Sequence, residues 1–349
     1  MPTVVTGTAR ARARGFARSN SFRLTMRLVV GAGVLFAVVT HVGTGPFLHG
    51  LLSLDGPTIG AAAALAAIAT AAAAWRWRLV AGRLGLELPW PTAVAMYYRS
   101  QFLNTVLPGG VVGDVHRAVA HGQRVKRIGQ ASRAVAIERS AGQVVQLTLA
   151  LVILLCVGAG FGGYAATTLD LGGTVLTVTV IGGTMLVGGV LAALVLSVRV
   201  RTALRHEVAE LRVGLGSARA SCQVAIASVV VVACHVAVFA IATAAVGVHV
   251  PPLQLLILAL VVLLGASIPL NVGGWGPREG IAGWAFALAG FGASAGVAAS
   301  ALFGILAIIS FAPGAIVTVV FAVRRRGQQP VPALVPLIHC LPRRQENPS

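Results

Sequence analysis

The chain has 349 residues, of which 57% are hydrophobic and only 10% charged, and its mean hydropathy is +0.87. These values exclude an ordinary soluble globular protein, and several apolar runs near twenty residues long indicate a multi-pass membrane protein. The four cysteines show no CxxC or other close spacing, which argues against a zinc site or a disulfide framework.

The apolar runs predict the order of the membrane-spanning helices. Residues 1–27 are expected to form a basic cytoplasmic tail, residues 28–323 the transmembrane domain, and residues 324–349 a basic, proline-rich cytoplasmic tail. Within the domain we expect spans at residues 28–45, 57–75, 134–160, 173–198, 222–246, 253–269, 277–291 and 295–323. The predicted fold is an all-α, polytopic membrane helix bundle with about eight transmembrane helices and one or two broken or re-entrant segments.

The basic residues set the orientation of these spans. If the N-terminus lies inside the cell, all 27 Lys and Arg residues fall on the cytoplasmic side. The positive-inside rule then predicts a plasma-membrane protein with both termini in the cytoplasm. This topology and the attraction of anionic headgroups account for the formal charge of +18, so we expect membrane lipids as partners and no nucleic acid.

The stretch NTVLPGGVVGDVHRA, residues 104–118, interrupts a region that begins and ends on the basic side. It cannot belong to a complete crossing, so we expect it to lie in the interface or to enter the membrane and turn back. A non-helical path at membrane depth is tolerated only where it is buried in protein or faces a wet cavity. The predicted backbone breaks are Pro108, Gly109, Gly110 and Gly113. Beyond them, Asp114 and Arg117 share one helical face.

A second stretch, SIPLNVGGWGPREGIAG at residues 267–283, has a similar composition. It also combines an Asn, a glycine pair, a further Gly, an acid and a base, and its predicted breaks are Gly273, Gly274, Gly276 and Pro277. An internal repeat is plausible, because paired interrupted helices point to the central site of a transporter. However, four predicted spans separate the two breaks and place both at the same face, so a strict inverted repeat would require an error in that count.

A third stretch, AIERSAGQVVQ, places Glu138 and Arg139 at the start of a long apolar helix. They could form a local ion pair that anchors the helix end, or join a polar cluster with the two broken segments. We expect the cluster to contain Asp114, Arg117, Glu138, Arg139, Arg278 and Glu279. Guanidinium groups and helix starts after glycine breaks both suit phosphate, which suggests a phospholipid or polyprenyl-phosphate headgroup. We expect His235, in an apolar span, to be an ordinary packed residue.

Together, RSQFLNTVLPGGVVGDVHRA, ERSAG and IPLNVGGWGPREG resemble the membrane region of lysylphosphatidylglycerol synthases, a flippase-like family. The resemblance covers about residues 28–323 and implies a membrane unit that moves a modified phospholipid between leaflets. No soluble transferase domain accompanies it here, which puts synthesis of that lipid in doubt. The family's motif positions correspond to Arg99, Asn104, Pro108, Gly109, Gly110, Asp114, Arg117, Glu138, Arg139, Asn271, Gly273, Gly274, Arg278, Glu279 and Gly280.

Three function classes follow from these observations. The favoured one is a protein that binds and translocates a phospholipid or lipid-linked substrate, without catalytic residues, cofactor or metal. The alternatives are an integral-membrane transferase that uses a lipid-linked donor, and a non-catalytic accessory subunit of a cell-envelope pathway, whose partners would be envelope enzymes or a second copy of the chain. The expected substrate-binding residues are Arg99, Asn104, Asp114, Arg117, Glu138, Arg139, Asn271, Arg278 and Glu279.

Overall fold

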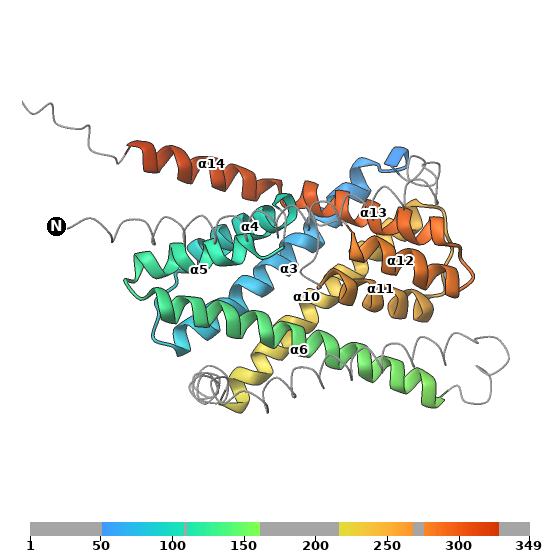
Figure 1. The fold of residues 1–349 in the computed structure, drawn as a ribbon, viewed down its shortest axis with the longest axis horizontal. Coiled ribbons are helices and arrows are strands. Elements are labelled where there is room, and N and C mark those ends of the chain that lie inside the picture. Colours follow the sequence, from blue (N-terminus) through green and yellow to red (C-terminus); the bar gives the residue numbers. More distant parts are fainter. Residues whose placement is uncertain (1–50, 108–109, 161–215, 268–275, 328–349) are drawn as a thin grey trace, which may run out of the picture.

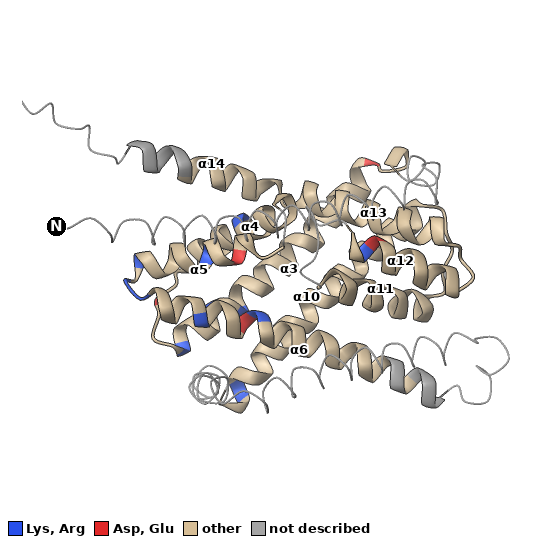
Figure 2. Ribbon diagram, viewed as in Figure 1, with Lys and Arg blue, Asp and Glu red and all other residues tan. Residues whose placement is uncertain are grey.

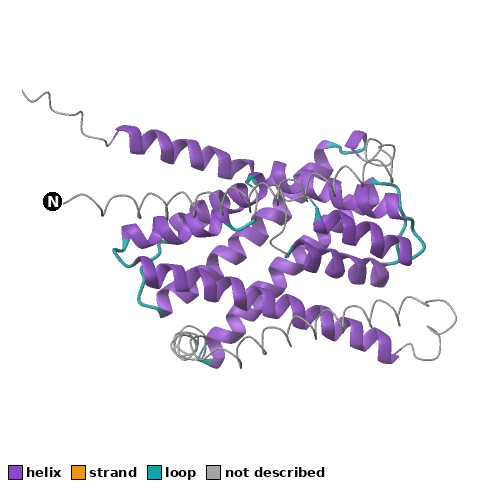
Figure 3. Ribbon diagram, in the orientation of Figure 1, coloured by secondary structure: helices purple, strands orange, loops and turns teal. Residues whose placement is uncertain are grey.

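The computed structural model describes residues 51–107, 110–160, 216–267 and 276–327, and within these ranges it contains helices and loops but no strand (Figure 3). The predicted all-α fold is therefore confirmed. Several predictions lie outside the described residues: the tail at 1–27, the spans at 28–45 and 173–198, and Pro108, Gly109, Asn271, Gly273 and Gly274.

Most of the described helices overlap the predicted apolar runs, whereas two lie between the runs predicted at residues 57–75 and 134–160. They are α3 (Gly56–Arg83), α4 (Trp90–Val106), α5 (Val112–Arg124), α6 (Ile128–Gly160), α10 (Ala218–Ala245), α11 (Pro252–Ala266), α12 (Pro277–Leu288), α13 (Ala293–Ser310) and α14 (Ala312–Gly327). Three stretches of the described residues are long and apolar enough to cross a membrane, namely α3, α10 and Ala293–Phe321. The structure is thus that of a helical membrane protein.

Helices α3 and α10 pack against each other as an antiparallel pair at the centre of the molecule (Figure 1). Each has 28 residues, a length of about 42 Å, which exceeds the roughly 30 Å of a bilayer's hydrocarbon core. Ser53, before α3, donates to the carbonyl of Ala245 at 2.8 Å, and Arg83 at the other end donates to Ser217, which caps α10. The start of α3 therefore lies beside the end of α10.

Helices α4 and α5 form a hairpin, because α5 turns back along α4 after the break at residues 107–111. The hairpin opens at the end of the molecule where α3 finishes, since only Leu84–Pro89 separate α3 from α4. His121, near the end of α5, contacts the carbonyl of Glu87 at 3.1 Å and stacks edge-on against Trp77 of α3. The sequence therefore turns back on itself here, as predicted for a segment that does not cross the membrane completely.

Helices α11 and α12 form a second hairpin, which opens at the opposite end of the molecule (Figure 1). Only residues 246–251 separate α10 from α11, so α11 begins where α10 finishes. An apolar cluster at this end joins Leu54, Val246, Leu288 and Phe291 to the core around Phe286. Because α3 and α10 are antiparallel, the two hairpins enter from opposite ends and their tips approach each other.

This arrangement corrects the predicted spans at residues 253–269 and 277–291. They are the two arms of one hairpin, and α11 and α12 have only 15 and 12 residues, lengths of about 22 and 18 Å that fall short of a bilayer core. Counting α11 as a full crossing placed both breaks at the same face, which is wrong. Each half has the order long helix, hairpin, long helix, with α3 to α6 inverted relative to α10 to α13, as in an inverted-topology repeat.

The last predicted span, residues 295–323, is divided in two at Phe311. Pro313 lies in the first turn of α14, where a missing N–H costs little, and Gly314 lets α14 approach the backbone of Tyr98 on α4 closely. Helix α14 continues through Gly327, so it includes arginines that the sequence assigned to the tail.

The charges in the described part of the chain are distributed unevenly along the molecule (Figure 2). Lys and Arg lie at the end where α3 and α5 finish, or in the interior, whereas the loops at the other end, residues 51–55, 246–251 and 289–292, contain none. Arg278 is the exception to the predicted sidedness, because it sits at the tip of the second hairpin rather than at the basic end. The molecule therefore has a basic end, where α3 and α5 finish, and an opposite end whose described loops carry no Lys or Arg.

Candidate functional site

The first half of the site is built around Asp114, in the opening turn of α5. Its carboxylate accepts from Ser100 and Asn104 of α4, both at 3.1 Å, from Arg117 at 3.0 Å, and from Arg139 of α6 at 2.7 Å. Ser100 and Asn104 are one turn apart on the same helical face, so both reach the start of α5. Asp114 thus ties both arms of the hairpin to α6.

Glu138 forms a second, fully buried centre on α6. It accepts from Nε of Arg76 and from Arg117, both at 2.9 Å, and from the hydroxyl of Tyr97 at 3.2 Å. Arg76 also donates to Ser228 of α10 at 2.7 Å. A buried carboxylate is stabilised only when it is paired and hydrogen-bonded in this way, and Glu138 connects α3, α4, α5 and α6.

Arg117 links these two carboxylates. Its guanidinium carbon lies 4.5 Å from the ring centroid of Trp77 and 4.3 Å from that of Tyr97, within the range of cation–π attraction. The side chain is completely buried. Its position between two rings and two carboxylates makes Arg117 a fixed internal support, since no part of it reaches open space.

The second half of the site lies at the tip of the other hairpin. Glu279 accepts from the N–H of Gly276 at 2.6 Å, which closes the first turn of α12, and from Ser300 of α13 at 3.3 Å. Arg278 donates through Nε to Glu279 at 2.9 Å and to Ser300 at 3.0 Å, and its guanidinium lies 5.3 Å from the ring centroid of Phe303.

The two halves use equivalent positions. Asp114 is the third residue of α5 and Glu279 the third residue of α12, where a negative charge interacts favourably with the helix dipole. Each acid follows a chain break and accepts from a serine, although Ser100 comes from α4, the first arm of its hairpin, and Ser300 from α13, the long helix after the other hairpin. The similarity of the two broken segments is therefore present in three dimensions as well as in sequence.

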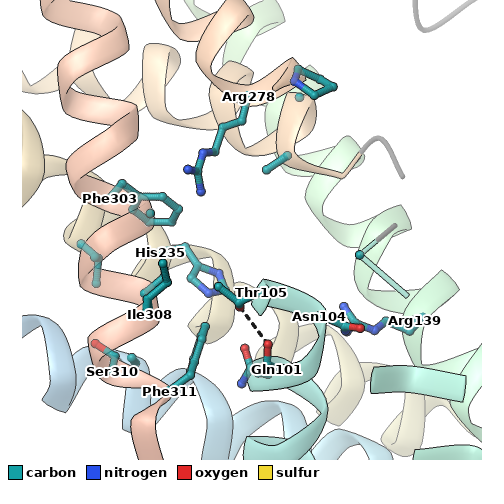
Figure 4. Close-up of a pocket in the computed structure, with 18 residues that line it drawn as sticks. Gln101, Asn104, Thr105, Arg139, His235, Arg278, Phe303, Ile308, Ser310 and Phe311 are labelled. Atoms are coloured by element: carbon teal, nitrogen blue, oxygen red, sulfur yellow. Dashed lines mark hydrogen bonds between the residues drawn. The ribbon is translucent and has the colours of Figure 1, made fainter. Parts of the chain in front are cut away.

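A central cavity of about 240 Å³ lies where the hairpin tips meet. Figure 4 shows Arg278 above this cavity, Arg139 beside Asn104 at its lower right, His235 of α10 at its left and Gln101 below. The Arg139 side chain is 38% exposed, although Asp114 holds one of its nitrogens. The Arg278 side chain also borders the cavity but is only 9% exposed and is paired with Glu279, so Arg139 is the more accessible of the two.

A lateral cavity of about 620 Å³ adjoins the central one and shares Gly110, Arg139, His235, Ala266 and Phe303 with it. On its outer side it is bordered by Val111, which precedes α5 and is 47% exposed, and by Val115 and Val119 of α5, which are 60% and 37% exposed. Helix α5 therefore has the reverse of the pattern in a soluble protein, since the face with Asp114 and Arg117 is buried and its valine face is exposed. The combined space joins a basic interior to an apolar exterior.

The predicted cluster is only partly confirmed. Asp114, Arg117, Glu138 and Arg139 converge, whereas Arg278 and Glu279 form a separate group that reaches the first across the central cavity. Arg99 lies outside both groups, with its guanidinium 5.4 Å from the ring centroid of Phe321 on α14, and its role in substrate binding stays a prediction. Asn271 lies outside the described residues.

The predicted backbone breaks need one correction. Gly110 has φ of 62° and Gly276 has φ of 126°, conformations that favour glycine, and Pro277 begins α12. Gly113, in contrast, belongs to α5 and does not break the chain. A Cβ at this position would collide with the backbone carbonyl of Ser100, so Gly113 serves the close approach of α4 and α5.

Sequence reasoning missed three contributors. Arg76 was grouped with the arginines that set topology, although it pairs with Glu138. Tyr97 also contacts Glu138, but nothing in the sequence around it indicated a place in the site. His235 was assigned to ordinary packing, yet it borders the central cavity and the lateral cavity. The sequence WRWR at residues 75–78 offered a clue for Arg76. Residues two apart in a helix face different directions, so Arg76 and Arg78 cannot both point outward from the same face.

The chemistry of the first group favours an anion. Three guanidinium groups, from Arg76, Arg117 and Arg139, face two carboxylates, which leaves one positive charge in excess, and Arg139 carries it toward the cavity. Across the cavity Arg278 supplies a second guanidinium fork, which suits phosphate oxygens. Among the described residues no group of three or more His, Cys, Asp or Glu side chains is placed to hold a metal ion.

Comparison with known proteins agrees with this architecture. The family model described as the lysylphosphatidylglycerol synthase TM region matches residues 24–314, which is most of the chain. A search of curated proteins returned no match.

Proposed function

The chain belongs to the lysylphosphatidylglycerol synthase TM region family, membrane domains associated with lipid handling, and from this premise we propose that it binds the phosphate of a lipid headgroup and moves that lipid between leaflets. The substrate class is a phospholipid or a lipid-linked, polyprenyl-phosphate compound. The protein acts as a translocator rather than a transferase, in a plasma membrane with both termini in the cytoplasm.

The observation that carries this proposal is the meeting of two oppositely inserted hairpins at one cavity. In transporters built from inverted repeats, the broken helices surround the substrate site near the bilayer midplane. Here the tips contribute Asn104 and Gly110 from one side and Pro277 and Arg278 from the other. A headgroup held between Arg139 and Arg278 would touch both halves at once, so a change in either half would alter its access to one leaflet.

The lateral cavity supports a lipid over a small soluble anion. Its valines on α5 and the adjoining Val135 on α6 provide an apolar path that leads directly to Arg139. Acyl chains on this path would stay in contact with apolar side chains rather than with water, while the phosphate would reach guanidinium groups that neutralise it. An amphiphile with one anionic end fits both parts, whereas free phosphate would use only the inner one.

Binding is tested by native mass spectrometry of the purified protein. We expect the wild type to retain an anionic phospholipid or a lipid-linked phosphate, and Arg139→Ala and Arg278→Ala each to lose it. Arg127→Ala is the matched control, because Arg127 is exposed at the basic end and its side chain donates to Gln130 at 3.5 Å, away from both cavities. Equal lipid retention by all four proteins would contradict the proposed headgroup site.

A further inference from the structure

A separate interfacial cavity of about 600 Å³ lies at the basic end of the α3–α10 pair, away from the hairpin tips. It is formed by the last turns of α3 and the first turns of α10. The side chains that matter for the argument are Trp75, Arg78, Leu79 and Arg83 from α3, and Arg219 and Gln223 from α10.

The depth of this interfacial cavity matches the headgroup region of a bilayer. Helix α3 has 28 residues, and its length of about 42 Å equals the full thickness of a bilayer including headgroups, roughly 40–45 Å. Arg83 at its end therefore lies at headgroup level, while Trp75, two turns earlier, lies near the boundary with the acyl chains, where tryptophan is preferred. The wall thus changes from apolar to basic along the membrane normal.

The charges of this cavity are uncompensated within the described part of the chain. Arg78, Arg83 and Arg219 have no acidic partner there, although Arg83 donates to Ser217. The first turn of α10 adds the positive end of its helix dipole. The neighbouring Arg76 differs completely, since it points inward to Glu138. Three guanidinium groups around one open space attract an anion of matching size.

We propose that the interfacial cavity binds the headgroup of an anionic phospholipid from the basic-side leaflet, as a resident ligand distinct from the transported one. Basic pockets between transmembrane helices on the cytoplasmic side are suited to such headgroups. Arg78 and Arg219 approach the phosphate from the two helices, and Trp75 with Leu79 contacts the upper part of an acyl chain. The lipid joins the ends of α3 and α10, the helices around which the two halves are arranged.

The test measures how phosphatidylglycerol raises the unfolding temperature of the purified full-length protein in detergent, with phosphatidylcholine as the neutral comparison. All variants in this experiment also carry Arg139→Ala and Arg278→Ala, which remove the guanidinium groups of the central cavity. Binding to the interfacial cavity is therefore measured whether or not the proposed transport site exists. We expect stabilisation by phosphatidylglycerol alone. The double substitution Arg78→Gln and Arg219→Gln should weaken its apparent affinity about 30-fold.

Two further variants separate the site from general charge effects. Lys126→Gln with Arg127→Gln removes the same charge from an exposed loop at the same end and should leave the affinity unchanged. Arg78→Lys with Arg219→Lys keeps the charge and should retain most of the binding. Unchanged affinity in the glutamine variant, or an equal loss in the loop variant, would overturn the proposal. Equal stabilisation by inorganic phosphate would also overturn it, because the site would then take a free anion.

Discussion

Replacing Glu138 with glutamine should destabilise the protein more than any other single charge removal described here. Glu138 is fully buried and neutralises both Arg76 and Arg117, with the hydroxyl of Tyr97 as a third donor. Glutamine keeps the shape but loses the charge, and its amide nitrogen faces a guanidinium donor. The excess positive charge of the first group rises from one to two.

The magnitude follows from the cost of leaving a buried charge without a partner. Removing one member of a buried ion pair costs about 3–5 kcal/mol, and Glu138 serves two such pairs. We therefore expect Glu138→Gln to lower the free energy of unfolding by about 3–5 kcal/mol. Adding Arg76→Met returns the excess positive charge from two to one, so the double variant should lose less than the sum of the single losses by about 0.5–3 kcal/mol.

The assay is reversible unfolding in mixed micelles with increasing dodecyl sulfate, followed by circular dichroism. Glu87→Gln is the control, because Glu87 is exposed in the loop before α4 and should change the free energy by no more than about 0.5 kcal/mol. If Glu138→Gln unfolds at the same dodecyl sulfate concentration as Glu87→Gln, the buried network does not hold α3, α5 and α6 together, and the reasoning is refuted.

Three further predictions concern packing and capping. Gly113→Ala should separate α5 from α4 and abolish lipid retention at the central cavity, whereas Gly129→Ala, which meets open space, should leave it intact. Gly296→Ala, against the Ala282 carbonyl, should cost about 1–3 kcal/mol in the same unfolding assay, while Gly280→Ala should cost nothing. Asp55→Ala should lower the unfolding temperature at neutral pH, because the Thr58 side chain and the Thr58 N–H hold the pKa of the Asp55 carboxyl below its ordinary value. This contribution is complete above the ordinary pKa and disappears as the pH falls through the lowered one, whereas Asp55→Asn should keep the cap at every pH.

The sequence allowed the broken segments to be recognised because their chemistry is local. Pro, Gly and charged residues within an apolar run are expensive in lipid, so the stretches around Asp114 and Glu279 could be assigned to a protein-lined interior without knowledge of the fold. The same argument identified Glu138 and Arg139. Each prediction depended only on the cost of placing a given residue type at membrane depth.

The relation between the two hairpins could not be obtained in this way. Residues 253–269 are nearly long enough to span a bilayer, and only their packing as α11 against α12 shows that they turn back. Arg76 was hidden for a similar reason, since its charge is the same as that of Arg78 and only the packing of α3 places one inside and the other outside. Both errors arose from tertiary contacts that composition does not record.

The most direct test of the central claim is lipid movement in liposomes that contain the purified protein and a fluorescent anionic phospholipid. Dithionite added outside quenches only the outer leaflet, so the extent of quenching reports exchange between leaflets. We predict that the wild type and Arg127→Ala allow nearly complete quenching, and that Arg139→Ala and Arg278→Ala leave the inner leaflet protected. Quenching of only the outer leaflet by the wild type, or complete quenching by both cavity variants, would contradict a translocation path through the cavity between the two hairpins.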